Sequence, residues 1–254
     1  MWELLTSTEA WAAFLTLVIM EIILGVDNIV FISIQTDKLP PEQQKKGRNL
    51  GLLFALFTRI VLLLSITWVM TLTTPLFNLA DWFGIDGEWH ERLSISGRDL
   101  ILMIGGMFLM YKSIKEIHEN VEGESHLATG KKKPTTFLNT VIQIGLLDIV
   151  FGLDSVITAV GMAEDVEIMI AAVVVSMIFM VFSLNFISQF VNQHPSVKIL
   201  ALSFLLLIGI SLIAESIEQP IAKGYIYSAM AFSIFVEFLV IRAAKNKGQK
   251  RASN

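Results

Sequence analysis

Two short stretches of the chain place paired acids within apolar sequence. Residues 21–28 read E-I-I-L-G-V-D-N, and residues 148–155 read D-I-V-F-G-L-D-S. Each stretch has an acid, a glycine four residues later and an aspartate two residues after the glycine. An ionised side chain at the centre of a membrane helix costs roughly 2.5–3.5 kcal/mol on insertion scales. Four such acids of one sign require protons or a bound cation, so the two stretches predict a buried cation site.

The groups available to that cation are oxygen donors. The candidate metal ligands are Glu21, Asp27, Asn28, Asp148 and Asp154. Carboxylate and amide oxygens suit Mg²⁺, Ca²⁺ and Mn²⁺, whereas Zn²⁺ and Cu²⁺ prefer imidazole or thiolate ligands. The chain has no cysteine, and its four histidines fall in predicted loops or at the ends of predicted spans. We therefore expect a hard or borderline divalent cation as substrate, with protons as the alternative or the coupled ion, and no resident cofactor.

Three other charged residues fall within or at the ends of apolar segments. Arg59 lies inside the predicted span 50–74, away from both of its ends, and we expect it to be the counter-ion of one of the acids. Glu215 and Glu237 fall in the last turns of predicted spans. We expect these two glutamates to lie at an interface or in helix contacts and not to bind the cation.

The composition indicates that these acids lie in a membrane protein. Of the 254 residues, 54% are hydrophobic and 17% are charged, whereas a soluble domain has about 25% charged residues. The formal net charge of −4 gives no reason to expect a nucleic-acid partner. A span needs roughly 20 mostly apolar residues. The candidates are seven: 10–34, 50–74, 97–115, 136–162, 167–191, 197–215 and 224–241.

Basic residues give the spans a direction. Of the 19 Lys and Arg residues, 15 fall in one set of alternate loops, three fall in the other set, and one is Arg59. Cytoplasmic loops carry the excess of Lys and Arg. The count predicts a multi-pass protein of the cell membrane, with the N-terminus outside and the C-terminus in the cytoplasm.

The repeated motif divides the chain into two halves. The first copy opens spans 1–3 and the second opens spans 4–6, and because three is odd the second half enters the membrane from the opposite side. The predicted architecture is an all-α membrane protein with two inverted three-helix repeats, at 1–115 and 136–220. A cytoplasmic linker at 116–135, a seventh helix at 221–243 and a basic cytoplasmic tail at 244–254 complete it. Inverted repeats are common in transporters, whose sites lie near the midplane between the repeats.

Depth and helix periodicity place the acids relative to one another. Glu21 and Asp148 fall near the middle of their spans, with Asp27 nearer the cytoplasm and Asp154 nearer the outside. On a regular helix Asp27 lies roughly 120° round from Glu21. A local break or a close helix approach at the motif glycines is therefore expected to bring the acids into one cavity.

Both acidic stretches resemble the TerC family of integral membrane proteins, named for tellurium resistance. Four other segments are similar to that family: D-K-L-P-P-E at 37–42, S-G-R-D-L at 96–100, V-N-Q-H-P at 191–195 and K-G-Y at 223–225. The resemblance covers about residues 5–243. It implies a seven-span fold with inverted halves, Mn²⁺ export as the activity, and ion binding by Glu21, Asp27, Asn28, Asp148 and Asp154.

The leading hypothesis is a non-enzymatic divalent-cation transporter that exports Mn²⁺ by alternating access. One alternative is a non-transporting membrane protein that acts in tellurite or metal stress or in protein assembly. Another is an intramembrane aspartyl protease, since two aspartates near glycines in different spans could share a proton. The motifs read G-V-D and G-L-D and so lack the G-x-G-D pattern of such proteases. The sequence alone does not fix the metal among Mn, Mg and Ca, the coupling ion or the oligomeric state.

Overall fold

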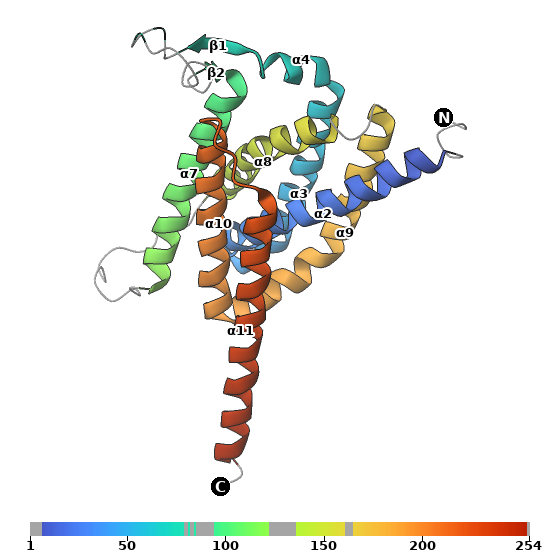
Figure 1. Cartoon of the computed structure of the whole chain (residues 1–254). Helices are drawn as coiled ribbons and strands as arrows, with labels where there is room; N and C mark the ends of the chain where they lie inside the picture. The colour runs from blue at the N-terminus through green and yellow to red at the C-terminus, as the bar shows by residue number, and fades with distance from the viewer. Residues whose placement is uncertain are drawn as a thin grey trace.

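The protein is a bundle of long helices with one small sheet (Figure 1). The computed structural model describes residues 7–78, 81, 84, 94–121, 136–160 and 165–252, with side chains described as far as residue 243. Within these residues the elements, in chain order, are α2 (Thr8–Thr36), α3 (Pro41–Leu64), α4 (Ile66–Thr71), β1 (Pro75–Asn78), β2 (Ser94–Ser96), α7 (Gly97–Val121), α8 (Phe137–Val160), α9 (Val166–Gln193), α10 (Pro195–Glu215) and α11 (Lys223–Ala252). The prediction of an all-helical class is confirmed, apart from the antiparallel pair β1–β2.

The second predicted span, 50–74, has different bounds in the structure. Its helix α3 begins at Pro41, because a proline is tolerated at the first helical position, where its missing N–H would have no partner. The helix ends at Leu64, and α4 continues after Ser65. The Ser65 hydroxyl donates to the carbonyl of Val61 at 2.7 Å, a back-bond that often bends helices. The apolar run is therefore divided between two helices.

Other boundaries extend beyond the predicted ones. Helix α7 continues to Val121, so residues 116–121 of the predicted linker are helical, while 122–135 lie outside the described residues. Helix α11 continues through most of the predicted tail, to Ala252. Both α2 and α8 are continuous through their motif glycines. The predicted local break at Gly25 and Gly152 is therefore wrong for the helix backbone.

The outer surface of the bundle suits a lipid environment. Six described helices are long and apolar enough to cross a membrane, namely α2, α3, α8, α9, α10 and the Lys223–Ala243 part of α11. Large apolar side chains point outward, including Phe182, Phe186 and Tyr225, which are 78%, 74% and 75% exposed. A soluble monomer rarely exposes so much continuous apolar surface. Six of the seven predicted crossings meet this test, and the crossing by α7 stays a prediction.

The start of α7 explains one of the sequence motifs. In S-G-R-D-L, the Ser96 hydroxyl accepts from the backbone N–H of Asp99 at 3.2 Å, and the Asp99 carboxylate accepts from the backbone N–H of Ser96 at 2.9 Å. This reciprocal pair is a capping box, which satisfies N–H groups that have no partner within the helix. Asp99 thus has a structural role, and its neighbour Arg98 is held at the rim of the bundle.

Helices from the two halves of the chain pack against each other. Helix α2 packs on α9, α8 packs on α3, and α7 packs on α10. In Figure 1, α7 and α10 run side by side, while α11 lies outside the bundle and extends past its end. The α7–α10 contact is close because glycines face each other there. A Cβ added at Gly106 would lie 2.8 Å from the carbonyl oxygen of Gly209.

Substituting Gly106 by valine is expected to destabilise the bundle. The new side chain would meet backbone atoms of α10, which cannot rotate away, so the two helices must separate. Overpacking of this kind costs about 1–3 kcal/mol. The melting temperature of the purified protein in detergent should fall for Gly106→Val. It should stay unchanged for Gly224→Ala, where an added Cβ meets nothing within 4 Å. Equal melting temperatures for both variants would contradict this packing.

Candidate cation site

Arg59 lies at the centre of the bundle, between the first acids of the two motifs. Its side chain is buried, and its guanidinium Nη1 pairs with Glu21 Oε2. Its Nε lies 3.8 Å from Asp148 Oδ1. Arg59 comes from α3, Glu21 from α2 and Asp148 from α8, so one cation joins three helices. The predicted counter-ion role of Arg59 therefore extends to two acids.

Asp148 has a second fixed partner. The Thr58 hydroxyl donates to Asp148 Oδ2 at 2.8 Å, one residue before Arg59 on the same helix. On its other side Asp148 shares with Asn28 the wall of a cavity of about 10 Å³. Such a space is at the lower limit for one water molecule. Glu21, Asn28 and Asp148 thus gather at a tightly packed centre.

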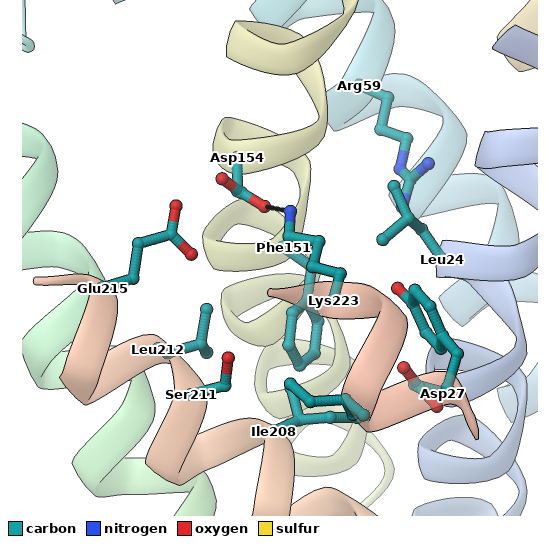
Figure 2. A pocket seen from close by; sticks show the side chains of 12 residues that line it. Leu24, Asp27, Arg59, Phe151, Asp154, Ile208, Ser211, Leu212, Glu215 and Lys223 are labelled. Atoms are coloured by element: carbon teal, nitrogen blue, oxygen red, sulfur yellow. Dashed lines mark hydrogen bonds and ion pairs between the residues drawn. The ribbon is translucent and has the colours of Figure 1, made fainter. Parts of the chain in front are cut away.

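Asp27 faces a different space. Its side chain is 8% exposed, and among the described residues no group donates a hydrogen bond to its carboxylate or forms an ion pair with it. It lines a cavity of about 60 Å³, and Figure 2 shows it on the other side of this pocket from Asp154 and Glu215. A volume of this size holds a few water molecules or a partly hydrated ion. The cavity also has Asp154, Glu215, Lys223 and Tyr227 in its wall.

A cluster of four charged side chains lies beside this cavity, and three of them are in its wall. We call it the Asp154 cluster: Arg98, Asp154, Glu215 and Lys223. Arg98 Nη2 lies 3.1 Å from Asp154 Oδ1 and also pairs with Glu215. Lys223, the first residue of α11, pairs with Asp154 Oδ2, as the dashed line in Figure 2 shows. Because the Lys223 side chain is 36% exposed, the cluster stands between the cavity and the surroundings.

The carboxylates around the centre and the cavity outnumber the side-chain cations there. Five acids belong to the centre and the cavity: Glu21, Asp27, Asp148, Asp154 and Glu215. Three cations accompany them: Arg59, Arg98 and Lys223. Asp99, beside Arg98, is held by its capping hydrogen bonds. With all five acids ionised, five negative charges face three positive charges, and the excess of two negative charges is one that a divalent cation or two protons would balance.

The structure divides the five predicted ligands between two places. Glu21, Asn28 and Asp148 lie at the centre, whereas Asp27 and Asp154 share the wall of the cavity. Within the described parts of the chain, no three acidic or histidine side chains converge closely enough to hold a metal ion. Asp27 also lines a second cavity, of about 260 Å³, between α2, α9, α10 and α11. That cavity is apolar except for Asp27 and Glu237, and Glu237 accepts from the hydroxyl of Ser196.

Sequence reasoning missed three residues of the Asp154 cluster. Glu215 was expected to lie at an interface or in a helix contact; it does contact α7 through Arg98, and it also lines the cavity, which was not expected. Arg98 and Lys223 belong to the motifs S-G-R-D-L and K-G-Y, whose cations were not connected with the acids. The available signal was that the segments containing Arg98 and Lys223 resemble the same family as the two acidic stretches do. Their partners lie 56 and 69 residues away in the chain, so spacing gave no indication of the contact.

A second polar cluster lies at the C-terminal end of α2. Asp37, just after this helix, accepts from Asn192 Nδ2 at 2.8 Å, so the D-K-L-P-P-E and V-N-Q-H-P motifs meet there. Arg48 donates to Ser188 at 3.1 Å, and Lys38 pairs with Glu116 on α7. These contacts join α2, α3, α7 and α9 at one end of the bundle.

Comparison with known proteins identifies the family. The model of the integral membrane protein TerC family matches residues 6–252. The chain belongs to this family. It is therefore an integral membrane protein, as its lipid-facing surface indicates, and the expected TerC resemblance is confirmed.

Relatives of the chain include proteins of its own length and longer ones. It is 49% identical to a UPF0053 protein of Haemophilus influenzae, over 95% of this chain and 98% of that protein. It is likewise 49% identical to the UPF0053 inner membrane protein YgdQ of Escherichia coli, over 95% of this chain and 97% of that protein. The inner membrane protein YoaE of Escherichia coli is 48% identical over 96% of this chain, which spans only 45% of YoaE. No solved structure matches the chain.

Removing Arg59 is expected to destabilise this TerC protein strongly. Arg59→Gln would leave Glu21 and Asp148 buried without a cation, and loss of one partner of a buried ion pair costs about 3–5 kcal/mol. The double variant Arg59→Gln/Glu21→Gln removes one charge of each sign and should recover much of the loss. Thermal unfolding in detergent measures both. If the double variant were as unstable as the sum of the two single variants, Arg59 would not act through Glu21.

Asp37 is expected to make stability depend on pH. Burial raises the pKa of Asp37 above 3.8, against the hydrogen bond from Asn192 and the positive charges of Lys198 and Arg48, while Glu116 raises it further. The folded state thus binds this proton more tightly than the unfolded chain does. Its contribution to stability is present below the unfolded pKa and is lost as the pH rises through the folded pKa.

The variant Asp37→Asn keeps the acceptor oxygen for Asn192 and removes the titration. It should melt at a higher temperature than the parent protein at about pH 7 and at the same temperature at about pH 4. Glu42→Gln, an exposed acid at the start of α3, is the control and should leave both melting temperatures unchanged. A gain for Asp37→Asn that is equal at the two pH values would argue against this titration.

Proposed function

We propose that this TerC protein is a transporter of divalent cations, not an enzyme, and that it exports Mn²⁺ from the cytoplasm across the cell membrane. The observation that carries the proposal is the unpartnered carboxylate of Asp27, buried in a membrane helix and facing a cavity. An ionised carboxylate buried there without a partner has a high free energy. Its presence is explained if a cation binds to it transiently. That cation is the one to be moved.

The charge deficit supports a divalent substrate. Arg59 balances one of the two central acids, and Arg98 and Lys223 balance Asp154 and Glu215. The remaining charge of about −2 equals the charge of one divalent cation with opposite sign. All candidate ligands are oxygen donors, which suit Mn²⁺, Mg²⁺ and Ca²⁺. Manganese is chosen among these because the TerC resemblance implies Mn²⁺ export. Protons are proposed to take the cation's place on the return step.

The packing supports a two-fold relation between the halves. In the proposed inverted repeat, α2 exchanges with α8, α3 with α9, and α7 with α10. This exchange turns the α2–α9 contact into the α8–α3 contact, and both are present. It turns the α7–α10 contact into itself, and there Gly106 and Gly209 face each other. We propose that α7 is the seventh crossing, since it packs alongside the span α10.

Asp27 is placed to alternate between two sides of the membrane. It lies in the wall of both cavities, one bounded by the Asp154 cluster and the other reaching Glu237 on α11. With the N-terminus outside, the Asp154 cluster lies toward the outside and Glu237 toward the cytoplasm. A cation would arrive from the side of Glu237, rest at Asp27 and leave past Asp154. Motion of the halves about the Arg59 centre would open one cavity while closing the other.

Neutralising Asp27 is expected to abolish transport and leave the fold intact. Asp27→Asn keeps the side-chain volume and removes a charge that has no partner to lose. In proteoliposomes containing a Mn²⁺-reporting dye, the flux should fall about tenfold or more, equivalent to at least 1.4 kcal/mol of lost cation stabilisation. Glu42→Gln, at an exposed acid, should transport like the parent protein. Cells that depend on the variant should accumulate Mn.

Two results would contradict the proposal. Parent protein that is folded in proteoliposomes and moves no Mn²⁺, Mg²⁺ or Ca²⁺ would favour a non-transporting role in metal stress or protein assembly. Undiminished flux through Asp27→Asn would separate transport from this carboxylate.

A further inference from the structure

We infer that Asp154 and Glu215 form a cation-release site, and that Arg98 and Lys223 are tethered cations that occupy it in the present conformation. The inference rests on the proposed transport function and adds Glu215, Arg98 and Lys223 to its machinery. A metal ion at this site would bind two carboxylates, and its departure would be driven by the return of the two side-chain cations.

The geometry around Arg98 defines a cation position. One nitrogen, Nη2, contacts Asp154 Oδ1 at 3.1 Å and also contacts Glu215 Oε1. Two carboxylates from different helices, α8 and α10, therefore already converge on one positive centre. An ion at that point would receive an oxygen from each of them. Carboxylates held in this way provide the ligand type that Mn²⁺ prefers.

Lys223 supplies the second positive charge and belongs to a peripheral helix. It pairs with Asp154 Oδ2, the oxygen that Arg98 Nη2 does not contact. Only 11% of the spanning part of α11 is buried, against 61% for α2 and α8. The chain before α11 turns through Glu218, a non-glycine residue with a φ of 57°. Lys223 is thus carried by the least buried of the six described helices that could span a membrane, and we infer that it can leave Asp154 without disturbing the centre.

The charges of the two states match. In the present conformation two carboxylates meet two side-chain cations, and with metal bound they would meet one ion of charge +2. If both side chains turn outward when the metal binds, the exchange changes no net charge within the low-dielectric bundle, where an unbalanced charge has a high free-energy cost. Asp27 gives independent support, because it is a buried carboxylate without a partner that faces the same cavity (Figure 2). An ion can pass from Asp27 to the pair without leaving the cavity.

The absence of native cysteines permits a direct test on the folded protein. The variant Lys223→Cys is purified at full length in detergent, and its single thiol is modified with one of two methanethiosulfonates. One reagent adds an ethylammonium group and restores the positive charge, and the other adds a neutral methylthio group. Binding of Mn²⁺ alone is then followed by electron paramagnetic resonance of the free ion. The 36% exposure of the Lys223 side chain gives the reagents access.

We expect the neutral adduct to bind Mn²⁺ about tenfold more tightly than the cationic adduct, since a tethered competitor is missing. Adding Glu215→Gln should abolish this difference. The same reagents at Lys198→Cys, on a cation near the opposite end of the bundle, should give equal affinities. Equal Mn²⁺ affinity of the two Lys223→Cys adducts would overturn the inference, because a purely structural ion pair affects stability and not metal competition.

A second variant covers the case in which Lys223→Cys does not fold. Glu215→Gln alone leaves Arg98 and Lys223 on Asp154, and it should bind Mn²⁺ about tenfold more weakly than the parent protein. Parent-like affinity in Glu215→Gln would also overturn the inference.

Transport by the parent protein separates this inference from the proposed function. If the parent moves Mn²⁺ while the two adducts bind it equally, the release site is wrong and the transport proposal stands. If the parent moves no cation while the neutral adduct binds Mn²⁺ through Glu215, the site stands and the transport proposal is wrong.

Discussion

Burial of negative charge in a low-dielectric bundle is the constraint on which the rest of this structure depends. At the centre, Arg59 supplies the positive charge that this burial requires: its guanidinium pairs with Glu21 and lies against Asp148. The planar guanidinium has five N–H donors, so it can bind carboxylates on two neighbouring helices at once. The pair contacts fix α2, α3 and α8 relative to one another. In the proposed transport cycle, the two halves of the protein would move relative to each other about this fixed centre.

Ion pairs between carboxylates and side-chain cations also occur in the Asp154 cluster, where they are less buried than at the centre. In the Asp154 cluster the cations come from the start of α7 and the start of α11, and the Lys223 side chain is partly exposed. A pair that water reaches is weaker and exchanges more readily than one sealed in the interior. Asp27 lines the same cavity as Asp154 but, among the described residues, has no hydrogen-bond or ion-pair partner of either kind. Under the proposed function, a cation at Asp27 would leave past the more exposed pairs of the Asp154 cluster and not through the sealed centre.

Much of the fold was predictable because lipid exposure imposes a simple requirement. A spanning segment must be helical and apolar over roughly 20 residues, so six of the predicted spans correspond to helices that satisfy the criterion. The errors occurred where hydropathy gives no information. Apolar residues continue through the break at Ser65, and Pro41 starts α3 well before the apolar run begins. Both boundaries depend on local hydrogen bonding, which an average over residue types does not detect.

The sequence by itself determined that buried acids exist, that oxygen is their ligand atom, that cysteine chemistry is excluded and that Arg59 is a counter-ion. Only the tertiary structure decided which acids share a space. It placed Glu21 with Arg59 at the centre and Asp27 with Asp154 in the wall of the cavity. It joined Asp154 to Arg98 and Lys223, far away in the chain. The sequence indicates which charged side chains lie in apolar segments and need neutralisation. Their partners depend on helix packing, because ion pairs form between groups that are close in space and not in sequence.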